Sequence, residues 1–311
     1  MKQINLEGME QITVIIPFRN EGKEVFRTIE ELRLHCDKNF RVVVINDASE
    51  DKFDYSELGG MSNVEYIQNT KSKGVAACRD MGASLAQTPY LLFLDAHMFV
   101  TSDILSPLHE FLKENPHALA CLQTVVYEGM APVRRPGRAI TRGCRINFSP
   151  KKLWMTEWQI LTPEDDDKNI LEIPCVMGAA YGISREYYNY LHGLKGLSGY
   201  GGDEQLLSTK VWREGGRCVL LKDVEIGHWY RSSSPYEIVV DTLFRNRLVT
   251  TKLLAPELLP SLAAEMPDVV GRIMSQLPEK EILEEYFYLQ GIFKRDMEFV
   301  YNLNGVGNNG I

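Results

Sequence analysis

Between residues 12 and 127, short runs of almost entirely apolar residues alternate with longer segments of helical periodicity. A strand with one solvent face alternates apolar and polar residues, so an uninterrupted apolar run predicts a strand covered on both faces. Segments in which apolar side chains recur every three or four positions predict amphipathic helices. Because right-handed crossovers join strands that alternate with helices, we predict an α/β fold with a mostly parallel sheet flanked by helices. The expected strands are Ile12–Pro17, Arg41–Asn46, Val64–Ile67, Tyr90–Leu94 and Leu119–Tyr127, and the expected helices contain Val25–Leu32, Gly74–Ala86 and Leu105–Glu114.

The rest of the chain is less regular in its middle and helical at its end. Residues 128–172 lack a clear period and include an acidic loop, Glu164–Asp167. Beyond Pro235 the pattern is helical to about Asn302. We therefore expect an α/β domain over residues 1–235 and a C-terminal helical extension over residues 236–311. The irregular part also holds an arginine-rich segment, either a solvated loop or a contact for an anionic ligand, with Arg134, Arg135, Arg138, Arg142 and Arg145.

Charge and composition exclude several classes of protein. The formal net charge of -8 argues against binding to nucleic acid. No apolar run approaches the about 18 residues that span a membrane, and the N-terminus has neither the basic nor the apolar region of a signal peptide. The six cysteines are far apart and form no C-x-x-C pair, so free buried thiols are expected, with disulfides as the alternative. We expect a cytoplasmic protein.

Polar residues follow two of the expected strands, at the sheet edge where α/β folds bind ligands. Asp47 follows the strand Arg41–Asn46, and Asp95 and His97 follow the strand Tyr90–Leu94. Asp95 and His97 come directly after the apolar run LLFL. In extended chain, residues two apart point to the same side, so both side chains could face one ion. A carboxylate and an imidazole suit Mn²⁺ and leave coordination positions open for diphosphate oxygens. The alternative is that Asp95 caps the next element and His97 is an ordinary loop residue.

Five further residues have one functional and one structural interpretation. His228 is a third metal ligand only if the fold returns it to Asp95; otherwise it is a hydrogen-bonded structural histidine. Asp203 and Glu204 open a helical stretch, as carboxylates beside a substrate or as part of an N-cap. Asp47 either contacts a nucleobase or ribose or caps a turn. Arg79 either neutralises a phosphate or is solvated.

Six segments, in order along residues 11–236, resemble motifs of one enzyme family. They are IIPFRNE, NDASED, LLFLDAH, IPCVMGAAYGIS, GYGGDEQLLSTKVWREGG and GHWYRSSSPY. Together they resemble the family-2-like glycosyltransferases with a GT-A fold, a Rossmann-like nucleotide-diphospho-sugar transferase fold. The resemblance is greatest to the catalytic domain of polypeptide N-acetylgalactosaminyltransferases.

The resemblance implies a role for each matching position. It implies metal ligands at Asp95, His97 and His228. It implies contacts to the nucleotide sugar from Pro17, Phe18, Glu21, Asp47, Arg79, Gly178, Ala179, Tyr200 and Arg231. It implies catalytic carboxylates at Asp203 and Glu204, with Asp203 also bordering the donor sugar.

The chain also departs from the family pattern. Asn46 replaces an acid, Ala179 a glycine and Tyr200 a tryptophan, so the donor sugar is left open. The pair Asp203-Glu204 stands where the family has Glu-Asn and is closer to the paired acids of inverting family-2 enzymes. No lectin-like domain, membrane anchor or stem is expected, so peptide glycosylation does not follow.

The resulting expectation is a metal-dependent glycosyltransferase that uses Mn²⁺ or another divalent cation. Its donor would be a UDP-sugar, either a UDP-hexose or a UDP-N-acetylhexosamine. The acceptor, a saccharide, peptide or lipid-linked molecule, and the stereochemical course stay open. Oligomers could form through the C-terminal helices. The alternatives are a catalytically silent nucleotide-sugar-binding or assembly module, and a sugar nucleotidyltransferase, which normally has a glycine-rich loop where this chain has PFRNEG.

Overall fold

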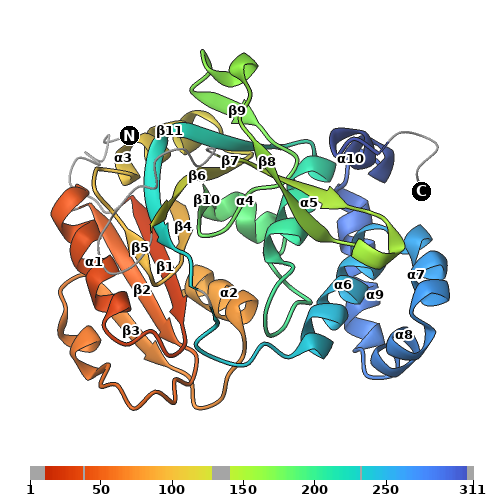
Figure 1. Ribbon diagram of the computed structural model, residues 1–311, viewed down its shortest axis with the longest axis horizontal. Coiled ribbons are helices and arrows are strands. Elements are labelled where there is room, and N and C mark those ends of the chain that lie inside the picture. The colour runs from red at the N-terminus through yellow and green to blue at the C-terminus, as the bar shows by residue number, and fades with distance from the viewer. Residues whose placement is uncertain (1–10, 38, 128–140, 232, 307–311) are drawn as a thin grey trace, which may run out of the picture.

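The computed structural model describes residues 11–37, 39–127, 141–231 and 233–306 (Figure 1). Its centre is a nine-stranded sheet in the order β3-β2-β1-β4-β10-β6-β11-β5, with β9 paired to β11. Strands β3, β2, β1 and β4 are mutually parallel, β10 is antiparallel to both of its neighbours, and β11 is parallel to β6. The sheet is therefore mostly parallel, as expected.

The strands and helices have the following bounds. The strands are β1 (Ile12–Phe18), β2 (Phe40–Asn46), β3 (Val64–Gln68), β4 (Tyr90–Leu94), β5 (Met98–Phe99), β6 (Ala118–Tyr127), β7 (Thr141–Asn147), β8 (Met155–Ile160), β9 (Ile170–Glu172), β10 (Ala180–Ser184) and β11 (Arg217–Trp229). The α-helices are α1 (Glu24–His35), α2 (Val75–Leu85), α3 (Leu105–Glu114), α4 (Arg185–Tyr190), α5 (Asp203–Glu214), α6 (Val240–Leu254), α7 (Leu259–Glu265), α8 (Pro267–Met274), α9 (Glu279–Ile292) and α10 (Met297–Leu303). The short 3-10 helices are η1 (Ser56–Gly60), η2 (Pro150–Lys152), η3 (Pro163–Asp165) and η4 (Pro256–Leu258).

The apolar runs form strands because both faces of the sheet are covered. Along β1, Val14 and Ile16 belong to the core shared with α1 and α3, whereas Ile15 belongs to the core shared with α2, α4 and α5. All three side chains are fully buried, and each such aliphatic side chain contributes about 1.5–3 kcal/mol. Helix α2 lies close to β1 because Gly82 has no side chain: a Cβ there would lie 2.4 Å from Ile15 Cγ2. This close packing fixes the helix that carries Arg79.

The segment expected to be irregular contains a second, two-stranded sheet. Strands β7 and β8 pair in antiparallel fashion, and a shift in register separates Thr141 from Cys144. Arg142 lies 3.3 Å from the Asp165 carboxylate, so it pairs with the acidic loop. Of the arginine-rich segment, Arg134, Arg135 and Arg138 lie outside the described residues.

The C-terminal helices pack on the α/β part through a shared core. Leu206 and Leu207 of α5 lie in one apolar cluster with Leu248, Val249 and Leu253 of α6. In Figure 1, α6 to α9 lie on the far side of α5 from the parallel strands. The C-terminal helices therefore share a core with the preceding part, and the division of the chain at residue 235 stays a prediction.

Two expectations from composition can be compared directly with the structure. All six cysteines are buried free thiols, as expected. Within the described ranges, no helix has both the length and the apolar character needed to cross a membrane.

Candidate active site

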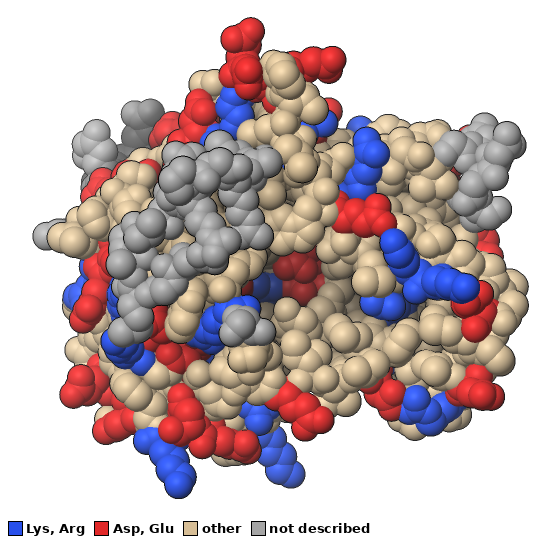
Figure 2. Space-filling view, in the orientation of Figure 1, with Lys and Arg blue, Asp and Glu red and all other residues tan. Residues whose placement is uncertain are grey.

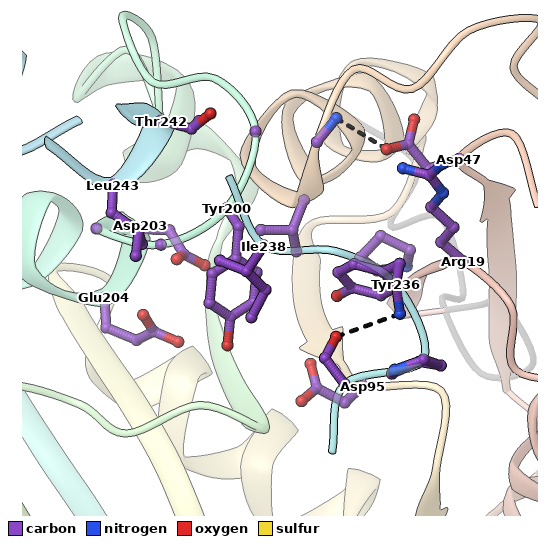
Figure 3. A pocket seen from close by; sticks show the side chains of 18 of the residues that line it. Arg19, Asp47, Asp95, Tyr200, Asp203, Glu204, Tyr236, Ile238, Thr242 and Leu243 are labelled. Carbon is purple, nitrogen blue, oxygen red and sulfur yellow. Dashed lines mark hydrogen bonds between the residues drawn. The ribbon is translucent and has the colours of Figure 1, made fainter. Parts of the chain in front are cut away.

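A cleft with a volume of about 870 Å³ opens at the carboxyl ends of the parallel strands. Figure 2 shows it as a hollow with acidic and basic side chains at its bottom. In Figure 3 it extends from Arg19 and Asp47 at one end to Glu204 and Leu243 at the other, with Tyr200 between them. The cleft is lined by these residues predicted from the sequence: Pro17, Phe18, Glu21, Asp47, Arg79, Asp95, His97, Tyr200, Asp203, Glu204, His228 and Arg231. Two other predicted residues, Gly178 and Ala179, are not among the residues that line it.

The structure brings Asp95, His97 and His228 together at the bottom of the cleft. Asp95 and His97 follow the end of β4. His228 is far from them in the sequence, but it lies next to them in space because β11 pairs with β5, which places His228 opposite Met98. The Trp229 amide also donates to the His97 carbonyl oxygen, at 3.2 Å. One ligand atom from each of the three side chains lies within 4.8 Å of the others. This is the convergence that a shared divalent ion requires.

The electrostatics of this group also suit a cation. Burial would raise the pKa of Asp95, but a hydrogen bond with His228 and the charge of Arg79 lower it to about 2, so the carboxylate is ionised. Burial lowers the pKa of His228, which favours the neutral imidazole that binds metals. Nε2 of His228 lies 3.4 Å from Asp95 Oδ2, and Nδ1 is buried without a hydrogen-bond partner among the described residues. An ionised carboxylate beside neutral imidazole nitrogens is a suitable ligand set for a divalent ion, so the three residues fit a metal site.

Glu21 supports this group from behind. One of its carboxylate oxygens lies 3.2 Å from Nδ1 of His97, which leaves Nε2 of that ring for a metal. Its other oxygen accepts a hydrogen bond from Arg231 at 3.1 Å, and the Arg231 guanidinium stacks on Trp229. Burial would raise the pKa of Glu21, but His97 and Arg231 lower it. A carboxylate behind a histidine ligand is a common way to fix the ring orientation.

Arg79 connects the metal group to the start of α5. Its guanidinium donates to Asp95 at 3.2 Å and forms an ion pair with Asp203. The Tyr181 hydroxyl also donates to Asp203, at 3.3 Å. Arg79 and Asp203 are both almost fully buried. Asp203 therefore has two internal partners, and its carboxylate holds Arg79 in place.

Glu204 is placed differently from its neighbour Asp203. Its carboxylate lies against the backbone of Gly178, where a Cβ would be 2.4 Å from Glu204 Oε1. Burial raises the pKa of Glu204, more than the charge of Arg79 lowers it. The residue lines the cleft, and no hydrogen bond or ion pair joins its side chain to another described side chain. Of the two acids, Glu204 is the one available to a substrate.

Asp47, at the opposite end of the cleft, organises the loop after β3. Its two oxygens accept four hydrogen bonds, from the Asn69 amide, the Ser72 hydroxyl and the backbone amides of Lys73 and Gly74, at 2.7–2.9 Å. Burial would raise the pKa of Asp47, but these donors lower it. Asp47 thus shapes the wall at this end of the cleft.

The loop of residues 198–202, which carries Tyr200 into the cleft, is held from two sides. On one side Gly74 touches Gly199 so closely that a Cβ on Gly74 would lie 2.1 Å from the Gly199 Cα. On the other side the buried side chain of Asn246, from α6, makes four hydrogen bonds to the loop. These join Asn246 to the Ser198 amide at 3.1 Å, and to the carbonyl oxygens of Ser198, Tyr200 and Gly201 at 2.8, 3.3 and 2.7 Å.

Replacing Asn246 with aspartate should therefore disturb the site as well as the fold. A carboxylate cannot donate to three carbonyl oxygens, so we expect a loss of about 1–3 kcal/mol in the free energy of unfolding. Because the loop leads directly into Asp203, we also expect kcat to fall at least about tenfold. Asn304→Asp is the control, since Asn304 is a buried amide that bonds Ile146 and Val300 away from the cleft. Equal kcat in the two variants, by steady-state kinetics, would contradict this role.

Sequence reasoning missed the cleft-lining residues that come from the β8 region, from α5 and from the start of the C-terminal helical part. They have no pattern of their own in the sequence, and they reach the site only because α6 packs on α5 and β8 lies beside it. The missed lining residues include Trp154, Met155, Thr156, Gln205, Ile238, Val239, Thr242, Leu243, Arg247 and Thr250.

Strand order, cleft position and the group of one carboxylate and two imidazoles define the class as a GT-A fold. The chain belongs to glycosyl transferase family 2, whose family model matches residues 13–191. It is similar to polypeptide N-acetylgalactosaminyltransferase 4 of Caenorhabditis elegans, with 27% identity over 74% of this chain and 40% of the relative. It is also similar to polypeptide N-acetylgalactosaminyltransferase 14 of Homo sapiens, with 26% identity over 72% of this chain and 41% of the relative.

A solved structure has the same fold. The crystal structure of GalNAc-T7 with UDP, GalNAc and Mn²⁺ superimposes with a TM-score of 0.78 at 21% identity, over 95% of this chain and 56% of that one. This likeness confirms the expected GT-A fold. The chain spans less than half the length of the two curated relatives just named.

Proposed function

We propose that this protein is a metal-dependent glycosyltransferase that transfers a sugar from a UDP-sugar, a hexose or an N-acetylhexosamine, to an acceptor hydroxyl. The observation that carries the proposal is the convergence of Asp95, His97 and His228 within 4.8 Å at the bottom of the cleft. Membership of glycosyl transferase family 2 supports it. So do the names of the relatives and the presence of UDP and Mn²⁺ in the GalNAc-T7 structure.

The three residues would hold Mn²⁺ or another divalent cation, which supplies positive charge to the diphosphate as it leaves. Glu21 orients His97, and Arg231 keeps Glu21 ionised. Arg79 holds Asp95 and Asp203 while adding positive charge beside the leaving group. Pro17 and Phe18, together with the wall that Asp47 organises, line the end of the cleft where the nucleoside would lie.

Glu204 is the residue that we propose to act on the acceptor. It lines the cleft and forms no ion pair with another described residue, whereas the carboxylate of Asp203 is bound to Arg79. In an inverting reaction Glu204 would accept the proton of the acceptor hydroxyl. In a retaining reaction it would hold the sugar or the acceptor. Asp203 acts in both cases through Arg79, as a positioning residue.

A screen of nucleotide sugars tests the proposal. We expect one UDP-sugar to be hydrolysed slowly with Mn²⁺ and not with EDTA, as measured by UDP release. A catalytically silent module would bind UDP without turnover. A sugar nucleotidyltransferase would instead consume a nucleoside triphosphate and a sugar phosphate with release of pyrophosphate. Either of these results would replace the proposed function.

We also propose a cytoplasmic location and self-association through the C-terminal helices. The six free thiols support a reducing compartment. Leu283 and Phe287, one turn apart on α9, are 53% and 64% exposed and offer an apolar surface for a second copy.

A further inference from the structure

The proposed function gives no role to a group of polar residues that lines the cleft together with Glu204. This part of the cleft is formed by α5, α6 and the chain before β8, and we call it the far end, defined by Trp154, Gln205, Arg247 and Thr250. Two hydrogen bonds fix its wall: Trp154 Nε1 donates to the Thr251 hydroxyl at 2.8 Å, and Gln205 Nε2 donates to the Trp154 carbonyl oxygen at 3.0 Å. The far end is therefore a formed part of the cleft.

Arg247 contributes a positive charge to the far end without a counter-ion. No carboxylate in the described parts of the chain forms an ion pair with it, and its guanidinium lies 5.2 Å from the Phe244 ring centroid. Burial lowers the pKa of Arg247, and no neighbouring charge opposes that effect. The other two arginines that the sequence placed in the cleft differ, because Arg79 is held by Asp95 and Asp203, and Arg231 is held by Glu21.

Two oxygen atoms of the far end are also without partners. Gln205 Oε1 and Thr250 Oγ1 are buried and accept no hydrogen bond within the described residues. Gln205 directly follows Glu204 on α5, and Thr250 lies three residues after Arg247 on α6. Buried polar atoms of folded proteins normally have partners. Two hydrogen-bond acceptors and a cation therefore line the same cleft as the proposed catalytic carboxylate.

We propose that the far end binds the acceptor, and that the acceptor is a saccharide with an anionic group, a carboxylate or a phosphate. This inference rests on the proposed function. Arg247 would bind the anion, and guanidinium geometry suits both kinds of anion. Gln205 and Thr250 would turn their unpaired oxygens toward the ligand to accept hydrogen bonds from its hydroxyl groups, and a further hydroxyl would face Glu204. A molecule with several hydroxyls and one negative charge matches these groups better than a neutral sugar or a peptide does.

Binding of small probes to the enzyme with UDP and Mn²⁺ tests the inference. The probes are methyl glucuronide, glucose 6-phosphate, methyl glucoside and a serine-containing acidic peptide, each titrated by calorimetry. We expect one of the two anionic sugars to bind at least tenfold more tightly than methyl glucoside, and the tighter one identifies the anion. Arg247→Met should remove that preference and leave UDP affinity unchanged. The control is Lys252→Met, which removes another positive charge of α6, one that is paired with Glu279 of α9. This variant should keep the preference for the anionic sugar.

Each other outcome overturns the inference. Equal affinity for the neutral and anionic sugars, no binding of any sugar, or tightest binding of the acidic peptide would each exclude an anionic saccharide. If Arg247→Met weakened UDP binding as strongly as sugar binding, Arg247 would be a contact of the donor. The proposed function fails separately, if the wild-type protein does not bind UDP in the presence of Mn²⁺.

Discussion

His228→Ala should abolish Mn²⁺-dependent UDP binding while the protein stays folded. The residue supplies one of three side chains whose ligand atoms lie within 4.8 Å, and its Nδ1 is buried with no hydrogen-bond partner among the described residues. Changes behind a metal ligand typically cost 10–100-fold in affinity, so loss of a ligand itself should cost at least about 100-fold. Calorimetric titration of UDP with and without Mn²⁺ measures this directly, and turnover of the UDP-sugar should fall in parallel.

The control for this experiment is His117→Ala. His117 is an exposed histidine that stacks on Tyr187 outside the cleft, so its loss should leave Mn²⁺-dependent binding unchanged. His97→Ala should behave like His228→Ala, because both rings belong to the same group, with centroids 4.8 Å apart. Wild-type affinity in either cleft variant would remove that histidine from the metal site and leave Asp95 without enough partners to hold an ion.

The parallel part of the sheet could be predicted from the sequence because its signal is local. The uninterrupted apolar runs of β1, β2, β4 and β6 reflect burial on both faces, and they occur where expected. Position at the carboxyl end of β4 was then sufficient to single out Asp95 and His97. The position of His228 beside them could not be predicted locally, because it depends on the pairing of β11 with β5, which is two residues long. Only a resemblance in motif order pointed to it.

Contacts between distant elements were beyond the reach of local patterns. Asn246 lies in a helix of ordinary composition, and nothing in its neighbours along the chain indicates that it holds residues 198–202. From the sequence alone, the adjacent acids Asp203 and Glu204 also could not be assigned different roles. They differ in the structure because Arg79 comes from α2 to pair with one of them. The β7–β8 pair was missed because its residues lack a regular alternation.

Glu204→Gln should leave Mn²⁺-dependent UDP binding near normal and lower kcat for transfer by about 10²–10⁴-fold, the usual contribution of a general base. Glutamine keeps the shape of the side chain against Gly178 and removes only its capacity to take a proton. Glu214→Gln is the control, because Glu214 ends the same helix and bonds Tyr187 and Lys294 away from the cleft. It should affect stability and leave kcat unchanged. Turnover of Glu204→Gln within a few-fold of wild type would exclude Glu204 as the base.

The pH dependence of kcat gives an independent test of this role. A base acts in its ionised form, and burial raises the pKa of Glu204 above the ordinary value of 4.5. Activity should therefore fall as the pH drops through that raised pKa, at a higher pH than for an exposed glutamate. Metal binding also weakens in acid because histidine ligands protonate, so kcat is to be measured at saturating Mn²⁺ and UDP-sugar. The residual activity of Glu204→Gln should lack this acidic limb. An unchanged limb in the variant would assign the titration to another group and would favour a retaining course in which Glu204 only holds its substrate.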